Sequence, residues 1–290
     1  MTQVSLVASK KSYQGAWAVL DPLKKELGTK LKNLDQLIIK INFVSTHTEL
    51  ATTPFETVKG FIDFVKPIFG GKIMIVEEAT LGDTQVGFER YGFKKLADKD
   101  RQIEVFNSDL SQTEKVRIKY PHGELTLLLA KIYTQSPFVV SICRAKTHDA
   151  VVVTLGIKNL LVGAIQNGER FKVHQGKDIH WVLAAIAQYT YPDMVIIDGV
   201  EGMEGNGPVS GKLIKAGWLA ASLDALAADS LAAYLMGFDI KDIGYLNLLK
   251  EAEFGKFYPR DEIEIIGDDP RQLIIPFKPH ATFESQRQWR

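Results

Sequence analysis

Four short apolar runs along the chain lack the polar alternation of a half-exposed strand. Each is rich in Ile and Val and is short enough to be a single strand. Continuous hydrophobicity of this kind is typical of strands that are buried on both faces, as in a parallel sheet covered by helices. The runs are Leu37–Asn42, Lys72–Glu77, Pro137–Ile142 and Met194–Asp198.

Segments with helical periodicity lie between these runs, at residues 54–69, 86–97 and 178–189. Thr53 is a suitable N-cap for the first of them. Ser222–Asp224 precedes an Ala- and Leu-rich helix that we expect to end at Gly237, because glycine suits the position after a helix. Alternating strands and helices predict an α/β fold with a doubly wound, mostly parallel sheet and helices on both faces.

The remaining segments are less regular. Residues 108–136 are consistent with a hairpin insertion followed by a helix, and Glu262–Ile266 is expected to form an edge strand. The tail from about Pro276 onward is polar, and its end is expected to fray. We find no internal repeat or Pro/Gly/Ser linker, so we expect residues 1–290 to form one domain.

Composition excludes several classes of function. Lys+Arg and Asp+Glu balance at 35 each, so the chain lacks the basic excess that would attract nucleic acid or an anionic membrane surface. A secretory signal and a membrane-spanning run are absent from the sequence, which predicts a cytoplasmic location.

Cys143 is the single cysteine and lies in an apolar run. It is expected to be buried, and it excludes an internal disulfide and an iron–sulfur cluster in this chain.

Polar residues follow each predicted strand. In open α/β sheets, ligands bind beyond the carboxyl ends of the strands, because helix N-termini and short loops converge there. The sequence therefore predicts a site made chiefly by residues 146–163 and 198–211. The polar clusters are residues 43–47, 78–84, 144–148 and 199–208.

The second of these two segments is glycine-rich. Five glycines between Gly199 and Gly211 would let backbone amides approach a ligand closely, and Gly205, Asn206 and Gly207 are candidate ligand contacts. The spacing matches neither a dinucleotide fingerprint nor a P-loop. Glu201 and Glu204, together with Asp198, could bind a divalent metal ion. The alternative is a glycine-rich turn without a ligand.

Three lysines stand in apolar surroundings: Lys40, Lys146 and Lys158. An unpaired buried lysine costs several kcal/mol. One explanation is a small anionic ligand that all three hold, aided by polar neighbours in the same runs. The other is three internal salt bridges to acids such as Glu77, Glu78 and Asp198. The polar neighbours are Asn42, Thr154 and Asn159.

Histidines supply the candidates for proton transfer. His148 lies in the same strand-end loop as Lys146, and its ordinary pKa suits a general acid or base. Asp198 or Glu204 would orient it. His174 is expected in the loop before a helix and is a candidate ligand contact. His174 and His180 are six residues apart, so they do not share a helix face as a zinc pair would. No recognisable serine or cysteine nucleophile motif is present.

Several segments of the chain together resemble a known family. They are IIKINFVST, VEEATLGDT, CRAKTHDAVVVTLGIKNLLVGAI, VIIDGVEGMEGNGPVSG and SLDALAADSLAAYLMGFD. In this order and spacing they are similar to the family named domain of unknown function 362, over about Val4–Gly255. Carried over by motif, the resemblance implies a shared site at Lys40, Asn42, Lys146, His148, Thr154, Lys158, Asn159, Asp198, Glu204, Asn206 and Asp224.

The resemblance also bears on redox chemistry. Many longer family members carry a ferredoxin-like module with Cys-x-x-Cys repeats and are described as oxidoreductases. This chain has a single cysteine, so a redox role would require an external redox partner or a dissociable cofactor. A looser likeness, in residue types alone, is to the nickel-pincer lactate racemases, in which a lysine carries the cofactor and histidines ligate the metal.

The sequence supports four readings. The first is an enzyme acting on a small anionic metabolite or a bound cofactor, with His148, Lys158 and Asp198 as catalytic residues. The others are a non-catalytic binder of small molecules, a metal-dependent enzyme, and a scaffold whose polar clusters pair among themselves. The first two predict that the lysines and histidines share one cavity.

Overall fold

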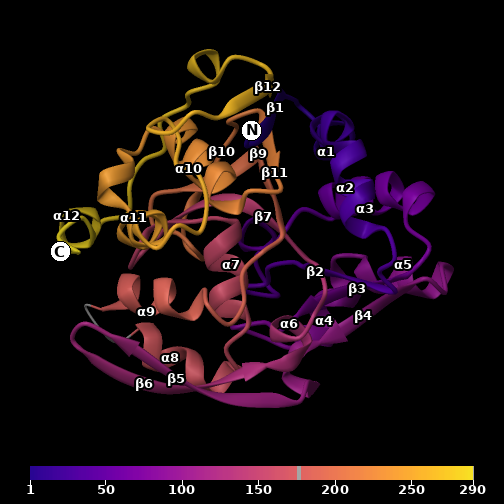
Figure 1. The fold of residues 1–290 in the computed structure, drawn as a ribbon, viewed down its shortest axis with the longest axis horizontal. Coiled ribbons are helices and arrows are strands. Elements are labelled where there is room, and N and C mark those ends of the chain that lie inside the picture. The colour runs from indigo at the N-terminus through magenta and orange to yellow at the C-terminus, as the bar shows by residue number, and fades with distance from the viewer. Residues whose placement is uncertain (175–177, 290) are drawn as a thin grey trace.

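The computed structural model describes residues 1–174 and 178–289. Its main feature is a large, mostly parallel sheet between two layers of helices (Figure 1). The strands follow one another across the sheet in this order: β12 (Glu264–Gly267), β1 (Gln3–Ala8), β11 (Trp218–Ser222), β9 (Met194–Glu204), β7 (Val139–His148), β2 (Gln36–Lys40), β3 (Lys72–Glu77) and β4 (Ile103–Asn107).

The parallel part of the sheet contains all four strands predicted from apolar runs. β9, β7, β2, β3 and β4 are mutually parallel neighbours. Beyond β9 the sheet becomes mixed, because β11 pairs antiparallel with both β9 and β1. β12 returns parallel to β1 and forms the edge, as expected for residues 262–266. The doubly wound α/β fold class is therefore confirmed.

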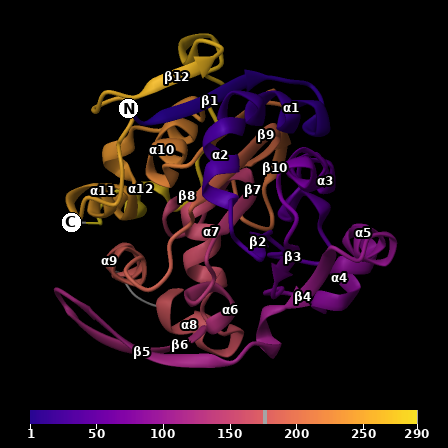
Figure 2. The same ribbon diagram turned by 45° about the vertical axis from the view of Figure 1, so that its right-hand side comes forward.

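Helices cover both faces of this sheet (Figure 2). One layer packs with Leu37, Ile39 and Ile196, and the other packs with Val195 and Ile197. The first layer consists of α1 (Ser12–Leu20), α2 (Lys24–Leu31), α3 (Phe55–Val65), α4 (Thr84–Arg90) and α5 (Phe93–Lys99). The second consists of α6 (Lys131–Thr134), α7 (Gly156–Gly163), α8 (Arg170–His174), α9 (Ile179–Ile186), α10 (Ala225–Leu235) and α11 (Gly244–Glu251).

Residues 108–136 form the expected hairpin followed by a short helix. β5 (Thr113–Tyr120) and β6 (Gly123–Ala130) make a separate two-stranded ribbon that runs beneath α8 and α9 (Figure 1). Val116, Ile118 and Leu127 are buried in the same core as α9. The ribbon therefore covers the second layer of helices on the side that faces away from the main sheet.

The glycine-rich segment is more regular than predicted. β9 continues as far as Glu204, and β10 (Lys212–Ile214) pairs back onto it antiparallel, so only residues 205–211 form the turn. A second short strand, β8 (Val152–Thr154), pairs with the end of β7 in the same way. Both predicted strand-end loops are therefore hairpins, which place their backbone more firmly than open loops would.

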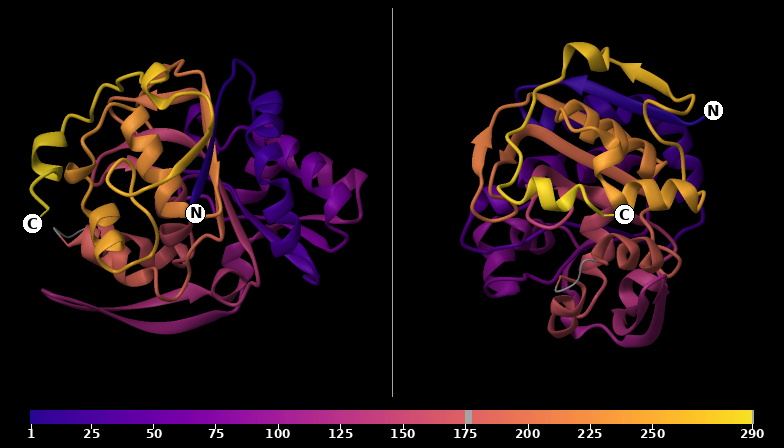
Figure 3. Two further views of the ribbon diagram at one scale, coloured as in Figure 1. Left: turned by 45° about the horizontal axis from the view of Figure 1, so that its top comes forward. Right: turned by 90° about the vertical axis from the view of Figure 1, so that its left-hand side faces the viewer.

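The C-terminal tail packs against the protein as far as the buried Trp289, whereas its end was predicted to fray; residue 290 lies outside the described residues. It runs over the outer side of α10 and α11 and ends in α12 (Phe283–Gln286) (Figure 3). Phe277 is buried, and its amide donates to the carbonyl of Met236 at 2.9 Å. The prediction failed because the apolar residues of the tail are too widely spaced to show a period, although they pack singly into the α10 layer.

Within the described residues, every helix is too short or too polar to cross a bilayer. The cytoplasmic location stays a prediction.

Candidate functional site

A cavity of about 330 Å³ lies between the carboxyl ends of β2, β3 and β7 and the helices α7 and α8. We call it the lysine cavity. Its lining contains seven of the residues predicted from sequence: Lys40, Asn42, His148, Thr154, Lys158, Asn159 and His174. Pro208, from the glycine-rich turn, closes one side. Strand exits, the helices α7 and α8 and one turn therefore meet at a single cavity, as expected from the convergence of the strand ends.

Lys40 has a carboxylate partner in the structure. Its ammonium forms an ion pair with Glu77, which ends the neighbouring strand β3 and is also buried. The second oxygen of Glu77 accepts the amide hydrogen of Phe43 at 2.8 Å. Burial lowers the pKa of Lys40, and the ion pair with Glu77 opposes that effect. Of the two explanations offered for the lysines, the internal salt bridge applies to Lys40.

Lys146 is bound by neutral groups. Its ammonium donates to the side-chain carbonyl of Asn42 and, at 3.1 Å, to the main-chain carbonyl of Ala51. The side chain is fully buried, and burial lowers its pKa to about 7. Lys146 therefore supports Asn42 from behind and does not itself line the lysine cavity.

Lys158 is different from the other two. Its side chain is 4 % exposed and lines the cavity, yet it has no hydrogen bond or ion pair with any described residue. Burial lowers its pKa to about 8, and nearby Arg170 acts in the same direction, while Asp149 opposes it. The buried hydroxyl of Thr154 also lacks a hydrogen-bond partner among the described residues. Two buried polar groups without protein partners thus face one cavity.

The position of Lys158 is fixed by the start of α7. The carboxylate of Asp229, on α10, accepts the amide hydrogens of Gly156 and Ile157, both at 2.9 Å. These are the first two residues of the helix, where backbone donors have no intrahelical partner. Gly156 has no space for a side chain, because a Cβ would lie 2.2 Å from Val195. α7 therefore packs directly against β9 and presents Lys158 to the cavity.

A second buried cation in the cavity, Arg170, was not recognised from the sequence. Its guanidinium pairs with the carboxylate of Glu78 at 3.2 Å and donates to the main-chain carbonyl of Glu78 at 2.9 Å. Glu78 also accepts the amide hydrogen of Asn167 at 3.1 Å. Burial raises the pKa of Glu78 to about 7, against the effect of Arg170. This pair ties α8 to the end of β3.

His148 is held as a neutral imidazole. Burial and the charge of Lys158 lower its pKa to about 3. Its Nδ1 accepts the amide hydrogen of Ala150 at 3.0 Å, and a main-chain amide cannot turn away from that position. The ring proton is therefore on Nε2. The carboxylate of Asp149 also lies 3.0 Å from Nδ1 and raises the pKa of His148, but the effect of burial is larger. His148 is a hydrogen-bond donor toward the cavity, which replaces the general-acid or general-base role expected from its ordinary pKa.

His174 has the opposite tautomer. It ends α8, not the loop predicted for it, and its Nδ1 lies 2.9 Å from the main-chain carbonyl of Arg170. A carbonyl can only accept, so Nδ1 carries the proton and Nε2 keeps its lone pair. Burial lowers the pKa of His174, so this lone pair is available at neutral pH. The rings of His148 and His174 are 6.1 Å apart, centre to centre. A donor and an acceptor are thus paired at one end of the cavity.

Asp198 lies on the other face of the sheet, contrary to its predicted catalytic role. Side chains alternate along a strand, and Asp198 shares the side of Met194 and Ile196, which pack under the α3 layer. Its carboxylate accepts from the hydroxyl of Thr57 and, at 2.8 Å, from the amide of Val200. It therefore neither orients His148 nor pairs with a lysine.

The predicted carboxylate metal site is not formed. Glu204 accepts the amide hydrogen of Lys278 at 2.8 Å, and Glu201 lies on the α3 side with its main-chain carbonyl bound to Arg144. Across the two described stretches, no group of three or more His, Cys, Asp or Glu side chains is placed to hold a metal ion. We therefore derive no chemical step through a metal.

The glycine-rich turn supports the cavity more than it lines it. The carbonyl of Gly205 accepts from the hydroxyl of Thr147 at 2.8 Å, and Asn206 is exposed. A Cβ on Gly207 would lie 2.2 Å from the carbonyl of Thr147, so glycine is required there for close packing. Among the described residues of the turn only Pro208 reaches the cavity lining.

Asp224, from the family motif, is the N-cap of α10 and accepts from the amide of Ala227.

Gln286 is a supporting residue that sequence reasoning missed. It is buried, accepts the amide hydrogen of Val152 and donates to the carbonyl of His148 at 3.0 Å. Val152 has a φ of 69°, which is strained for a β-branched residue. The C-terminal helix therefore holds the strained turn that positions His148. No local pattern could reveal this, because 134 residues separate Val152 and Gln286.

Comparison with known proteins places the chain in a family. The family model described as "Domain of unknown function (DUF362)" matches residues 37–234. The chain belongs to this family. The match lies within the range expected from the sequence motifs and includes the main residues of the lysine cavity.

Two known proteins are similar to this DUF362 member. A thylakoid-associated protein of Synechocystis sp. is 26% identical over 266 residues, which are 89% of this chain and 79% of that protein. The lactate racemase apoprotein of Thermoanaerobacterium thermosaccharolyticum has a similar structure, with a TM-score of 0.52 and 13% identity. That similarity covers 81% of this chain and 57% of the racemase chain, and at this identity it concerns the fold alone.

Proposed function

We propose that this DUF362 member is an enzyme that binds a small carboxylate in the lysine cavity and transfers a proton on it. The observation that carries the proposal is the buried ammonium of Lys158, which faces the cavity without a partner among the described residues. With a pKa of about 8 it is mainly charged at neutral pH. A buried cation of this kind is stabilised by an anion that enters beside it.

The neighbouring groups fit a carboxylic acid. The free hydroxyl of Thr154 and the Nε2 proton of His148 are donors for a carboxylate or an adjacent oxygen. The lone pair on Nε2 of His174 is an acceptor, so it can take a proton from the carbon next to the carboxylate. The negative charge then shifts onto the substrate oxygens, where Lys158 and His148 stabilise it. Return of the proton from His174 completes the reaction.

The size of the cavity and the fold guide the choice of test substrate. A volume of about 330 Å³ suits a small metabolite. The lactate racemase apoprotein shares the fold, and lactate has both a carboxylate and an exchangeable hydrogen on the adjacent carbon. L-lactate and D-lactate, with malate as a larger 2-hydroxy acid, are therefore the first compounds to examine.

The test is solvent exchange in D₂O, followed by proton NMR at the carbon next to the carboxylate. We expect the wild-type protein to exchange that hydrogen in at least one of the three acids. Lys158→Met should abolish both binding and exchange, and His174→Gln should abolish exchange while retaining binding. Lys172→Met is the matched control, since Lys172 lies on α8 outside the cavity lining and pairs with Glu169.

Two results would contradict the proposal. Equal binding by wild type and Lys158→Met would show that Lys158 is not the anion site. Binding without exchange in the wild-type protein would favour the alternative of a non-catalytic binder. The control should behave as wild type in both measurements, so a general loss of structure is recognised.

A further inference from the structure

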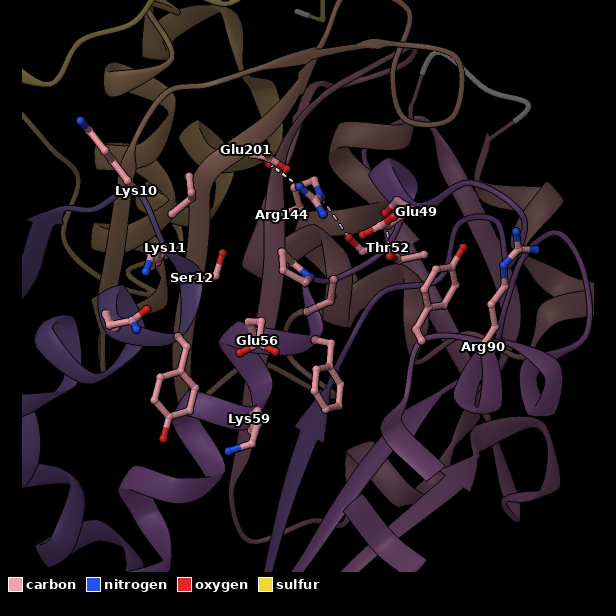
Figure 4. A pocket seen from close by; sticks show the side chains of 17 residues that line it. Lys10, Lys11, Ser12, Glu49, Thr52, Glu56, Lys59, Arg90, Arg144 and Glu201 are labelled. Atoms are coloured by element: carbon pink, nitrogen blue, oxygen red, sulfur yellow. Dashed lines mark hydrogen bonds between the residues drawn. The ribbon is translucent and has the colours of Figure 1, made fainter. Parts of the chain in front are cut away.

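A second and larger cavity lies on the opposite face of the sheet, on the side of α1 and α3. We call it the arginine cavity, because Arg144 is its buried cation (Figure 4). Its volume is about 1050 Å³. It is bounded by the first turns of α1 and α3, the end of α4 and the strands β7 and β9. It contains none of the residues assigned to the lysine cavity.

Arg144 is buried and forms no direct ion pair with a described residue. Its residue is 5 % exposed, its Nε donates to the carbonyl of Thr52 at 3.1 Å, and one terminal nitrogen donates to the carbonyl of Glu201 at 2.5 Å. Within the described part of the chain, no carboxylate lies within ion-pair distance of its guanidinium. Two neutral carbonyls fix the direction of the guanidinium, and the carboxylates of Asp198, Glu201 and Glu49 act on its charge only from beyond ion-pair distance. A buried guanidinium in this state is stabilised by a bound anion.

Helix geometry adds donors at the same place. Ser12 and Phe55 begin α1 and α3, both line the cavity, and neither helix has a side-chain cap. Uncapped N-termini present free amide hydrogens and a partial positive charge. The fully buried carboxylate of Asp198 lies behind these helix starts: it accepts from the hydroxyls of Ser12 and Thr57 and from the amide of Val200, and it lies beyond ion-pair distance of Arg144.

Side chains at the rim favour the same charge. Lys10 and Lys11, just before α1, are exposed and belong to the lining, and Figure 4 shows the side chain of Lys10 extending outward, away from Arg144. Among the described lining residues there are five cationic side chains, Lys10, Lys11, Lys59, Arg90 and Arg144, and three carboxylates, Glu49, Glu56 and Glu201. Lys59 is already paired with Asp63, so four other cationic side chains face three carboxylates, and the buried charge of the lining is the arginine.

Aromatic rings form the remaining wall. Tyr13, Phe55 and Tyr91 line the cavity and offer flat apolar faces. We infer that the arginine cavity binds a phosphate ester attached to a planar ring system, of about the size of a nucleotide. Arg144 and the free amides of α1 and α3 hold the phosphate, Lys10 and Lys11 attract it, and the rings contact the planar part.

The two cavities are separate but share a wall. The carbonyl of Ala51 accepts from Lys146 on one side, and the carbonyl of the next residue, Thr52, accepts from Arg144 on the other. The inference is therefore independent of the proposed function, since it uses different residues and a different ligand. Its failure would leave the carboxylate site unaffected.

Isothermal titration of the full chain with phosphate, pyrophosphate, AMP and ADP tests the inference. We expect AMP or ADP to bind with Kd below about 1 mM, and inorganic phosphate more weakly. Arg144→Gln should weaken nucleotide binding at least about tenfold. Lys10→Gln/Lys11→Gln should weaken it several-fold without affecting folding, because both side chains are exposed. Lys158→Met, in the other cavity, should bind nucleotide as wild type does.

The inference is overturned if the wild-type protein binds none of the four compounds at about 1 mM. It is also overturned if Lys10→Gln/Lys11→Gln and a folded Arg144→Gln both retain wild-type affinity. Binding of phosphate and pyrophosphate with no gain for AMP or ADP would overturn the assignment of the aromatic wall. Circular dichroism of each variant separates lost binding from lost structure.

Discussion

Asp229 and Gly156 are joined by a hydrogen bond of 2.9 Å that connects α10 to the first residue of α7. Ile157 donates to the same carboxylate. Because Lys158 follows directly, the contact determines where its ammonium lies in the cavity. A residue outside the cavity thereby positions the group on which the proposed function rests.

Asp229→Asn should destabilise the protein by about 1–3 kcal/mol, because an amide keeps one acceptor oxygen and turns its NH₂ group toward the second backbone donor. Urea denaturation at neutral pH measures the loss. Asp239→Asn is a suitable control, since Asp239 also accepts a backbone amide at the start of a short helical turn but is exposed. A cost for Asp229→Asn as small as that of the control would contradict the role assigned to Asp229.

Lys158→Met should make the protein more stable, by up to about 3 kcal/mol at pH 7, because it removes an unpaired buried charge. The pKa of Lys158 is about 8 in the folded chain and ordinarily about 10.5. The folded state therefore binds fewer protons than the unfolded state between these values, and wild-type stability rises over that window. The advantage of Lys158→Met should be greatest below pH 8 and should shrink toward pH 10.5. Thermal denaturation across this range shows whether it does.

Lys40→Met should have the opposite effect and cost about 3–5 kcal/mol, because it leaves Glu77 buried without its partner. Lys72→Met offers a matched control, since Lys72 forms an exposed ion pair with Glu104 between adjacent strands of the same sheet. That pair should contribute less than about 1 kcal/mol. Equal losses in the two variants, measured by urea denaturation, would show that burial of the Lys40 pair has no special importance.

Affinity for small carboxylates should fall as the pH rises above about 8, where the ammonium of Lys158 loses its proton. The decline should approach about tenfold per pH unit once deprotonation is the dominant change. Titration of lactate between pH 6 and pH 10 measures it. An affinity that stays constant across this range would remove Lys158 from the anion site, since His148 is already neutral throughout.

Gln286→Ala should loosen the turn at Val152 and cost about 1–3 kcal/mol, because two buried backbone groups lose their partner. Hydrogen exchange of residues 149–153 should accelerate. Gln288→Ala, two residues further along on the exposed side of the same segment, should leave exchange unchanged. Slow exchange in both variants would mean that the turn does not depend on the C-terminal helix.

The sequence predicted the fold well where burial leaves a continuous pattern. The runs at residues 37–42, 72–77, 137–142 and 194–198 became β2, β3, β7 and β9, as expected of strands buried on both faces. It missed β4 at the parallel edge, and it missed β11, which pairs antiparallel with β9, and β1, which pairs antiparallel with β11. The positions of these strands in the sheet are given only by the strand pairing in the structure.

The candidate site was predicted in part. Lys40, Asn42 and Lys158 line one cavity, as the convergence of strand exits implied. Asp198 does not, because residue type alone gave no indication of the face to which it points. Arg170 was overlooked, since an arginine in a short polar segment resembles a surface residue until its pairing with Glu78 is seen.

The sequence by itself determined the set of buried strands, because an unbroken apolar run is recognised from consecutive residues. With the strands came the common edge of the sheet at which their polar ends meet. What only the tertiary structure decided was the partner of each buried charge. Lys40 received Glu77, Lys146 received Asn42, and Lys158 received none among the described residues. These outcomes depend on groups brought together from distant positions, such as Lys40 and Asn159, which are 119 residues apart. Such neighbours depend on which face of the sheet a side chain points to and on how the crossover helices bring strands together. A local sequence pattern does not show either.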